Sequence, residues 1–183
     1  MSNNVRIAIS GHSGCGNTTV TRLLSERFKF QMVNYTFRNL AHEKGIEFRE
    51  FCKMAENDSR WDRYVDDRQV KLAMEGDSIL GSRLAIWMLE KADLKVFLTA
   101  SPGTRASRIH KREGGVLQDR MRETEERDAR DHARYMKLYN IDNNEYRFAD
   151  LIINTDRMDP GQVVEIIGAA ISNVLKEKGR SET

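Results

Sequence analysis

One stretch of the chain reads Gly11-His-Ser-Gly-Cys-Gly-Asn-Thr-Thr19. Residues 5–10 before it form the apolar run Val-Arg-Ile-Ala-Ile-Ser, and residues 20–28 after it have a helical pattern. We therefore expect a strand, a glycine-rich turn and the start of a helix. In the phosphate-binding pattern G-x-x-x-x-G-K-[ST], glycines let the backbone wrap around a polyphosphate, which N–H groups and the helix dipole bind. Gly11, Gly16 and Thr18 match this pattern, so the stretch predicts a phosphate-binding loop.

The position of the loop lysine is occupied by Asn17. A lysine brings a full positive charge to the phosphates, whereas an amide donates only neutral hydrogen bonds. We therefore expect either that another residue supplies the charge or that phosphoryl transfer is weak. The alternative interpretation of the stretch is a glycine turn that merely closes a strand–helix connection.

Length and composition indicate a single domain and exclude several classes of protein. A chain of 183 residues is long enough for one substantial core and a movable lid. Its net charge of +2 does not suggest a nucleic-acid-binding surface. Cys15 and Cys52 do not form a disulfide framework, and no apolar run approaches the ~18 residues of a membrane span. We expect a cytoplasmic monomer that has no nucleic-acid or membrane partner.

Strand and helix patterns alternate along the chain. Apolar runs bounded by turn residues predict strands at residues 5–10, 31–34, 78–81, 95–99 and 151–154. Helical patterns lie at residues 20–28, 37–44, 46–55, 61–74, 84–91, 104–112, 117–139 and 161–178. This alternation predicts an α/β fold in which helices flank a parallel sheet of about five strands. The site is expected at the carboxyl edge of that sheet.

A glycine pair precedes the most charged part of the chain. Gly114-Gly115 interrupts the helical pattern, and the arginine-rich residues 119–134 follow. This arrangement is typical of a lid that closes over a polyphosphate. The alternative is a solvated helix stabilised by pairs such as Glu123 with Arg127.

Four stretches together resemble the cytidylate kinase family of P-loop nucleoside monophosphate kinases, in its short, archaeal-type form. They are Asn17-Thr18-Thr19 in the loop, Tyr35-Thr36-Phe37-Arg38 after the second strand, Gly81-Ser82-Arg83 after the third, and Arg127-Asp-Ala-Arg-Asp-His-Ala-Arg134. Residues 139–155 also match that form, so the likeness covers nearly the whole chain. The resemblance implies one P-loop NTPase-type kinase domain over residues 1–183, with a helical monophosphate-binding insertion at about 35–75 and a lid at about 112–134.

The resemblance also implies a reaction and the residues that serve it. The γ-phosphoryl group of ATP, bound with Mg²⁺, passes to CMP, with dCMP as a further candidate, giving CDP and ADP. Thr18 is the implied Mg²⁺ ligand. The expected ATP-binding residues are Gly11, Ser13, Gly14, Cys15, Gly16, Asn17, Thr18, Thr19, Arg108 and Arg112. The expected monophosphate-binding residues are Thr36, Arg38, Arg83, Arg127 and Asp131.

Phosphoryl transfer depends on positioning and charge neutralisation, which arginines supply. Arg127, Asp131 and Arg134 share one helix face because they are four and three residues apart, and we expect them to be catalytic. Arg134 is the first choice for the cation that Asn17 does not supply. Asp131 is expected to orient it or to accept ribose hydroxyls.

Two positions depart from the family pattern. Gly81 stands where the family commonly has an acidic residue that holds Mg²⁺ through water, and Leu84 stands where the bacterial form has an aspartate that reads cytosine. Cytosine recognition therefore cannot be assigned to residue 84. The alternative functions are a nucleotide-binding protein without turnover and a P-loop kinase for another small anionic acceptor.

Overall fold

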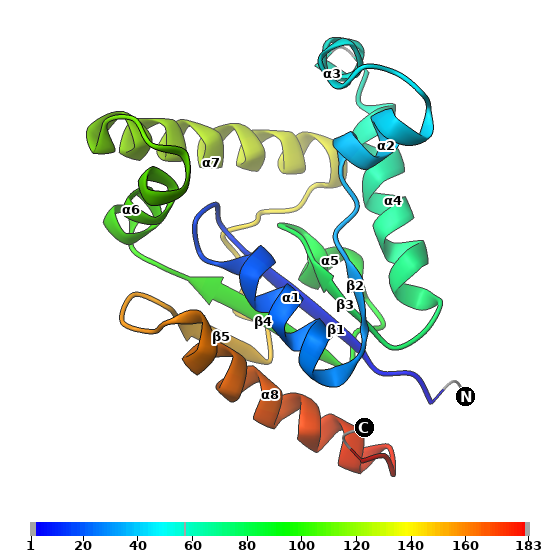
Figure 1. Ribbon diagram of the computed structural model, residues 1–183. Coiled ribbons are helices and arrows are strands. Elements are labelled where there is room, and N and C mark those ends of the chain that lie inside the picture. The colour runs from blue at the N-terminus through cyan, green and yellow to red at the C-terminus, as the bar shows by residue number, and fades with distance from the viewer. Residues whose placement is uncertain (1–2, 57, 182–183) are drawn as a thin grey trace.

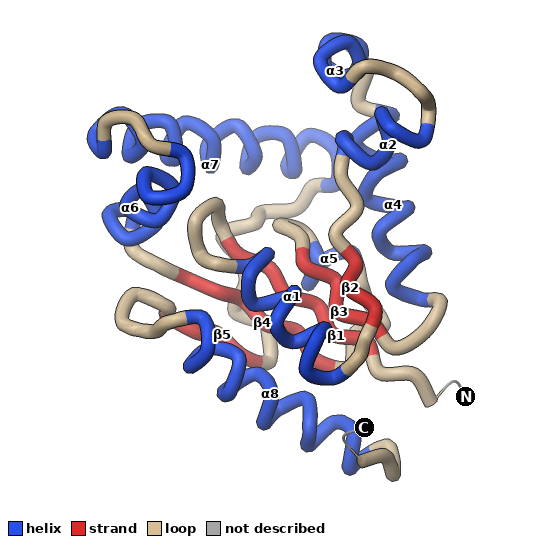
Figure 2. The backbone as a smooth tube through the Cα atoms, viewed as in Figure 1, coloured by secondary structure: helices blue, strands red, loops and turns tan. Residues whose placement is uncertain are grey.

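The computed structural model describes residues 3–56 and 58–181. Strands in this part of the chain form one parallel sheet in the order β2-β3-β1-β4-β5 (Figure 1, Figure 2). They are β1 (Arg6–Gly11), β2 (Gln31–Val33), β3 (Ser78–Gly81), β4 (Leu94–Thr99) and β5 (Leu151–Asn154). The predicted α/β fold with a five-stranded parallel sheet is confirmed.

The helices also follow the sequence pattern closely. They are α1 (Asn17–Phe28), α2 (Phe37–Glu43), α3 (Phe48–Glu56), α4 (Arg60–Met74), α5 (Ala85–Met88), α6 (Pro102–Glu113), α7 (Leu117–Tyr139) and α8 (Pro160–Glu177). The prediction of a helix over residues 84–91 was wrong in length, because α5 is a single turn. Leu89 is fully buried and its carbonyl accepts a hydrogen bond from the N–H of Ala92, so the chain turns back to enter β4 at Leu94.

Both faces of the sheet are covered. Side chains alternate between the faces of a strand, and in β1 Ile7 and Ile9 pack with α1 and α8 while Ala8 packs with α4 and α5. Figure 1 shows α1 and α8 on the near face and α5 behind the sheet. Burial on both sides explains why the central strands are almost continuously apolar.

Two helical segments rise beyond the carboxyl edge of the sheet. On one side α2, α3 and α4 pack around Leu40, Phe51 and Val65, and on the other side α6 packs against α7 (Figure 1). Gly114-Gly115 separates α6 from α7, as predicted. None of the helices in the described residues is long and apolar enough to cross a bilayer.

Candidate active site

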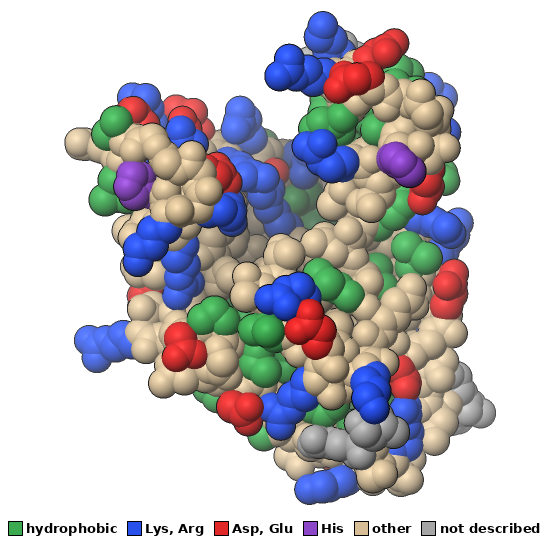
Figure 3. Space-filling view, in the orientation of Figure 1, with side chains coloured by type: hydrophobic (Ala, Val, Ile, Leu, Met, Phe, Trp, Pro, Cys, Tyr) green, Lys and Arg blue, Asp and Glu red, His purple; other side chains and the backbone are tan. Residues whose placement is uncertain are grey.

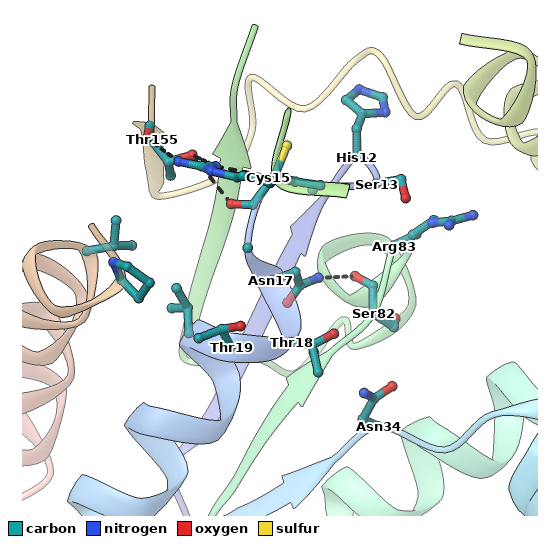
Figure 4. A pocket seen from close by; sticks show the side chains of 18 of the residues that line it. His12, Ser13, Cys15, Asn17, Thr18, Thr19, Asn34, Ser82, Arg83 and Thr155 are labelled. Carbon is teal, nitrogen blue, oxygen red and sulfur yellow. Dashed lines mark hydrogen bonds between the residues drawn. The ribbon is translucent and has the colours of Figure 1, made fainter. Parts of the chain in front are cut away.

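The phosphate-binding loop joins β1 to α1 and forms the floor of a cleft of about 830 Å³ (Figure 4). The cleft lies at the carboxyl edge of the sheet, where parallel α/β sheets bind ligands. Gly14 has a φ of +86°, and a Cβ there would lie 2.8 Å from the carbonyl oxygen of Arg105, so this position requires glycine. The predicted loop residues all line the cleft, namely Gly11, Ser13, Gly14, Cys15, Gly16, Asn17, Thr18 and Thr19.

The side chain of Asn17 is used within the protein. Its Nδ2 donates to the carbonyl oxygens of Ile9 (3.1 Å) and Ser82 (3.2 Å), and its Oδ1 accepts from the hydroxyl of Thr21 (3.1 Å). Figure 4 shows the amide turned towards Ser82. Asn17 therefore joins the start of α1 to β1 and to the segment after β3, and its amide is not free to serve a phosphate.

Gly81 belongs to the same packed arrangement. A Cβ on residue 81 would lie 2.3 Å from Oγ1 of Thr21, which is fully buried. A carboxylate therefore has no room at this position while Thr21 occupies it. The asparagine in place of the loop lysine and the glycine at position 81 are therefore linked through Thr21.

Thr18 faces the cleft beside Ser82 and Asn34, and all three residues line it (Figure 4). Mg²⁺ in phosphate sites keeps several waters and binds one or two protein oxygens together with the phosphates. Among the described residues, no group of three or more His, Cys, Asp or Glu side chains could hold a metal ion. The neutral oxygens present, among them the hydroxyl of Thr18, fit a Mg²⁺ ion that is carried by a nucleotide.

Arginines of α6 lie over the loop. Arg108 donates to the carbonyl oxygen of Gly14 (3.3 Å) and, through both terminal nitrogens, to Thr155 (2.9 Å to Oγ1 and 2.6 Å to the carbonyl oxygen). Arg108 and Arg112 both line the cleft, as expected of ATP-binding residues. Thr155, which follows β5, was not predicted from the sequence.

An ion pair between α6 and α7 also contacts the loop. Arg105 of α6 is 7% exposed, pairs with Asp128 of α7 (2.6 Å) and donates to the carbonyl oxygen of Ser13 (3.2 Å). Burial raises the pKa of the nearby Cys15 thiol to about 11, so this side chain is a neutral packing group in the loop.

A second cavity, of about 490 Å³, adjoins the cleft between α4 and α7. Asp131, 9% exposed, lies between two arginines: it pairs with Arg83 and accepts a hydrogen bond from Arg134 (3.3 Å). Arg134 also pairs with Asp62 of α4 (3.1 Å). This chain of alternating charges fixes both guanidinium groups in the cavity wall, and the expected contact between Asp131 and Arg134 is present.

The cleft and the second cavity share one wall. Thr36, Asp66, Arg83 and Arg127 line both. Arg127 is exposed and makes no ion pair within the described part of the chain. Arg134 lines only the second cavity, so Arg127 is the lid arginine that faces both. In Figure 3 the hollow between the two raised parts of the molecule carries several Lys and Arg side chains on its walls.

Arg38 is the predicted monophosphate-binding residue that the structure does not bring to the site. Its guanidinium stacks over the ring of Phe48 at 4.1 Å and lines neither cavity. Thr36, two residues earlier, caps α2 and lines both cavities. A contact between Arg38 and the acceptor therefore requires α2 to move towards the cleft and stays a prediction.

Polar residues of α4 were missed by the sequence reasoning. Asp66 lines both cavities, Gln69 lines the cleft, and Asp62 lines the second cavity. Burial raises the pKa of Asp66 to about 6 and also raises the pKa of Asp62. The three residues recur at i, i+4 and i+7 and form a polar stripe beside the apolar face of Val65. This helical spacing was the signal in the sequence that could have identified them.

Comparisons with known proteins agree with this geometry. The sequence model of the Cytidylate kinase-like family matches residues 6–157. Cytidylate kinase 2 of Borreliella burgdorferi is 42% identical over 89% of this chain and 93% of its own length, and cytidylate kinase of Pyrococcus horikoshii is 40% identical over 92% and 88%. Shikimate kinase from Bacteroides thetaiotaomicron shares the fold, with a TM-score of 0.61 at 14% identity over 91% of this chain and 98% of its own. The resemblance seen in the sequence is confirmed: the chain belongs to the cytidylate kinase-like family.

Proposed function

We propose that this protein transfers the γ-phosphoryl group of ATP to CMP or dCMP, giving CDP or dCDP and ADP. The observation that carries the proposal is the wall shared by the loop cleft and the second cavity, where Arg83 and Arg127 line both. A polyphosphate on the loop and a monophosphate in the second cavity would meet at this wall. We infer CMP as the acceptor from the cytidylate kinases to which the chain is similar.

The donor side binds polyphosphate mainly through the backbone. N–H groups of the loop and of the first turn of α1 lie at the positive end of the helix dipole, which favours anions. Arg108 and Arg112 add positive charge from α6. Mg²⁺ carried with ATP, and held by Thr18, supplies further neutralisation of the phosphate oxygens.

The acceptor side binds the monophosphate through arginine side chains. Arg83 is held by Asp131, which leaves its planar guanidinium positioned for a bidentate contact with phosphate. Arg127 has no ion-pair partner among the described residues and faces both cavities. It is the cation that lies best to stabilise charge on the transferred group, in place of the loop lysine.

The lid covers about residues 112–134, which include the end of α6, its connection to α7 and most of α7. The insertion of α2 to α4 covers about residues 35–75. Closure of both would exclude water and bring Arg38 towards the acceptor. One copy of the chain lines both cavities, which supports action as a monomer, and the proposed location is the cytoplasm.

The proposal is tested by measuring ADP release from ATP and Mg²⁺ with CMP, dCMP, UMP, AMP and GMP offered separately. We expect the highest kcat/KM with CMP or dCMP. ATP binding without turnover of any monophosphate would indicate a nucleotide-binding protein instead. Preference for UMP or AMP would contradict the acceptor while leaving the reaction class intact.

A further inference from the structure

The base of the acceptor needs polar partners that residue 84 does not supply. Leu84 is 2% exposed and apolar, so it offers no hydrogen bond to a nucleobase. Helix α4 borders the wall shared by the two cavities, and it presents Asp62 to the second cavity, Asp66 to both cavities and Gln69 to the cleft. These three side chains differ in how far their acceptor atoms are already used.

Asp62 is paired with a charged arginine, whereas the hydroxyl group that fixes Asp66 is neutral. Asp62 accepts from Arg134 at 3.1 Å. Oδ2 of Asp66 accepts a hydrogen bond from the hydroxyl of Tyr139 (2.6 Å), which fixes the carboxylate. Its Oδ1 has only the long contact of 3.4 Å with Nε2 of Gln69. One oxygen of Asp66 is therefore oriented and free to accept from a ligand.

Gln69 provides a second, unpaired acceptor one turn along the same helix. The residue is 5% exposed and lines the cleft, and its Oε1 is buried with no hydrogen-bond partner among the described residues. A buried amide oxygen without a hydrogen-bond partner destabilises the protein unless a donor binds to it. Its position beside Asp66 suits a hydrogen-bond donor group of a ligand.

We propose that Asp66 and Gln69 select the acceptor by accepting hydrogen bonds from the exocyclic amino group of a cytosine base. This inference rests on the proposed function and assigns the specificity of its acceptor. The amino group carries two hydrogens, which match two neighbouring acceptor oxygens. Uracil has a carbonyl oxygen at the same position, which would face both acceptors and leave them unpaired.

This selection is expected to be strong because Gln69 is buried and Asp66 is half-buried. Sites that leave buried polar groups unpaired with the wrong ligand discriminate far better than sites that differ by a methylene group. Ionised Asp66 strengthens the contact because a charged acceptor makes the stronger hydrogen bond. Tyr139 of α7 links the base site to the lid, since it orients the carboxylate from the opposite wall.

The test compares kcat/KM for CMP with that for UMP in Asp66→Asn and Gln69→Leu. The first substitution introduces an amide that can turn an N–H towards uracil, and the second removes the other acceptor. We expect the preference for CMP to fall at least about tenfold in each variant. Asp67→Asn is the matched control, because Asp67 is an exposed neighbour on α4 that lines neither cavity. It should keep the wild-type preference within about twofold, and circular dichroism establishes that each variant is folded.

The outcomes separate this inference from the proposed function. If the wild type prefers CMP, and Asp66→Asn and Gln69→Leu both keep that preference, the inference is overturned and the kinase assignment stands. If Asp66→Asn does not fold, Gln69→Leu alone decides in the same way. If the wild type turns over no monophosphate, the proposed function fails, and calorimetric affinities for CMP and UMP decide: equal affinities in the wild type overturn the inference, and a CMP preference lost in the variants supports it.

Discussion

The donor side of this protein consists mainly of backbone groups, whereas the acceptor side consists mainly of side chains. The donor side is one continuous loop, whose backbone follows β1 into α1 and whose Asn17 amide is used to fix that backbone. The acceptor side is made of side chains from β3, α4 and α7, with Asp131 and Asp62 holding arginines in place. We propose that backbone groups bind phosphate on the donor side and that arginine side chains do so on the acceptor side.

This difference explains how the site functions without the loop lysine. Asn17, Thr21 and Gly81 form a neutral, packed connection where a lysine and an acidic residue would otherwise stand. The positive charge lies instead on the facing elements, in Arg83, Arg108 and Arg127. The loop contributes shape, and the elements that face it contribute charge.

Replacing Arg127 by Ala should have the largest effect, because it removes a lid arginine that faces both cavities. We expect kcat to fall about a hundredfold or more, as loss of a transition-state cation does in other phosphoryl transferases, with a much smaller change in ATP affinity. Steady-state ADP release and ATP calorimetry measure the two quantities.

Arg122→Ala is the matched control on α7, since Arg122 is exposed, pairs with Asp119 and lines neither cavity. The sequence pattern favoured Arg134 for this role. A large loss in Arg134→Ala together with wild-type kcat in Arg127→Ala would assign the bridging cation to Arg134 instead.

Arg83→Lys should have the next largest effect and should act on the acceptor alone. Lysine keeps the charge but cannot reproduce the planar, bidentate contact, so we expect KM for CMP to rise about tenfold with ATP binding unchanged. Initial-rate measurements with each substrate varied in turn give the two constants. Unchanged CMP kinetics in Arg83→Ala would show that this residue is structural only.

Asn17→Lys probes the donor side and should not improve the enzyme. The substitution removes the hydrogen bonds to Ile9, Ser82 and Thr21, so we expect a loss of about 1–2 kcal/mol in the free energy of unfolding and no gain in kcat. Thermal unfolding and ADP release check both. A large gain in kcat would mean that the natural loop is impaired and would undo the contrast drawn between the two sides.

Asp66→Asn should have the smallest effect on stability, and its size depends on pH. Burial raises the pKa of Asp66 to about 6 in the folded protein, above its value in the unfolded chain, so folding favours the protonated form. Wild-type stability contributed by this group is present below the unfolded pKa and is lost as pH rises towards about 6. The amide does not titrate, so the variant should gain on the order of 1 kcal/mol relative to wild type near neutral pH and less in mild acid, at about pH 4.5.

Chemical denaturation at the two pH values measures this gain. The charged and titratable groups around Asp66 are Asp62 and Asp67 on α4 and Arg134 and Tyr139 on α7. Asp67→Asn on the same helix gives the effect of removing an exposed charge. An increment for Asp66→Asn that is equal at both pH values would contradict the raised pKa.

The donor side could be predicted from the sequence because its residues are contiguous and its glycines occur at the positions that the phosphate-binding pattern requires. Gly14 and Thr18 lie where the pattern expects them, and the strand and helix around them follow from apolar periodicity. The acceptor side could be predicted only in part. Arg83, Asp131 and Thr36 line its cavity, but Arg38 stacks on Phe48 in a contact that depends on how α2 meets α3.

The residues that were missed share a physical cause. Asp66 and Gln69 become important because α4 is placed against the cleft, which a pattern within one helix does not report. The use of the Asn17 amide was missed for a related reason, since its partners Ile9 and Ser82 lie at two different strand ends. Tertiary contacts decide which polar groups are free for a ligand.

The most direct test of the central claim follows a labelled γ-phosphate from ATP in the presence of Mg²⁺ and CMP. The arrangement of one wall facing both cavities predicts that wild-type protein transfers the label to CDP, and that Arg127→Ala does so about a hundredfold more slowly. Label appearing only in inorganic phosphate, or no release of label while ATP is bound, would contradict the claim that donor and acceptor meet at this wall.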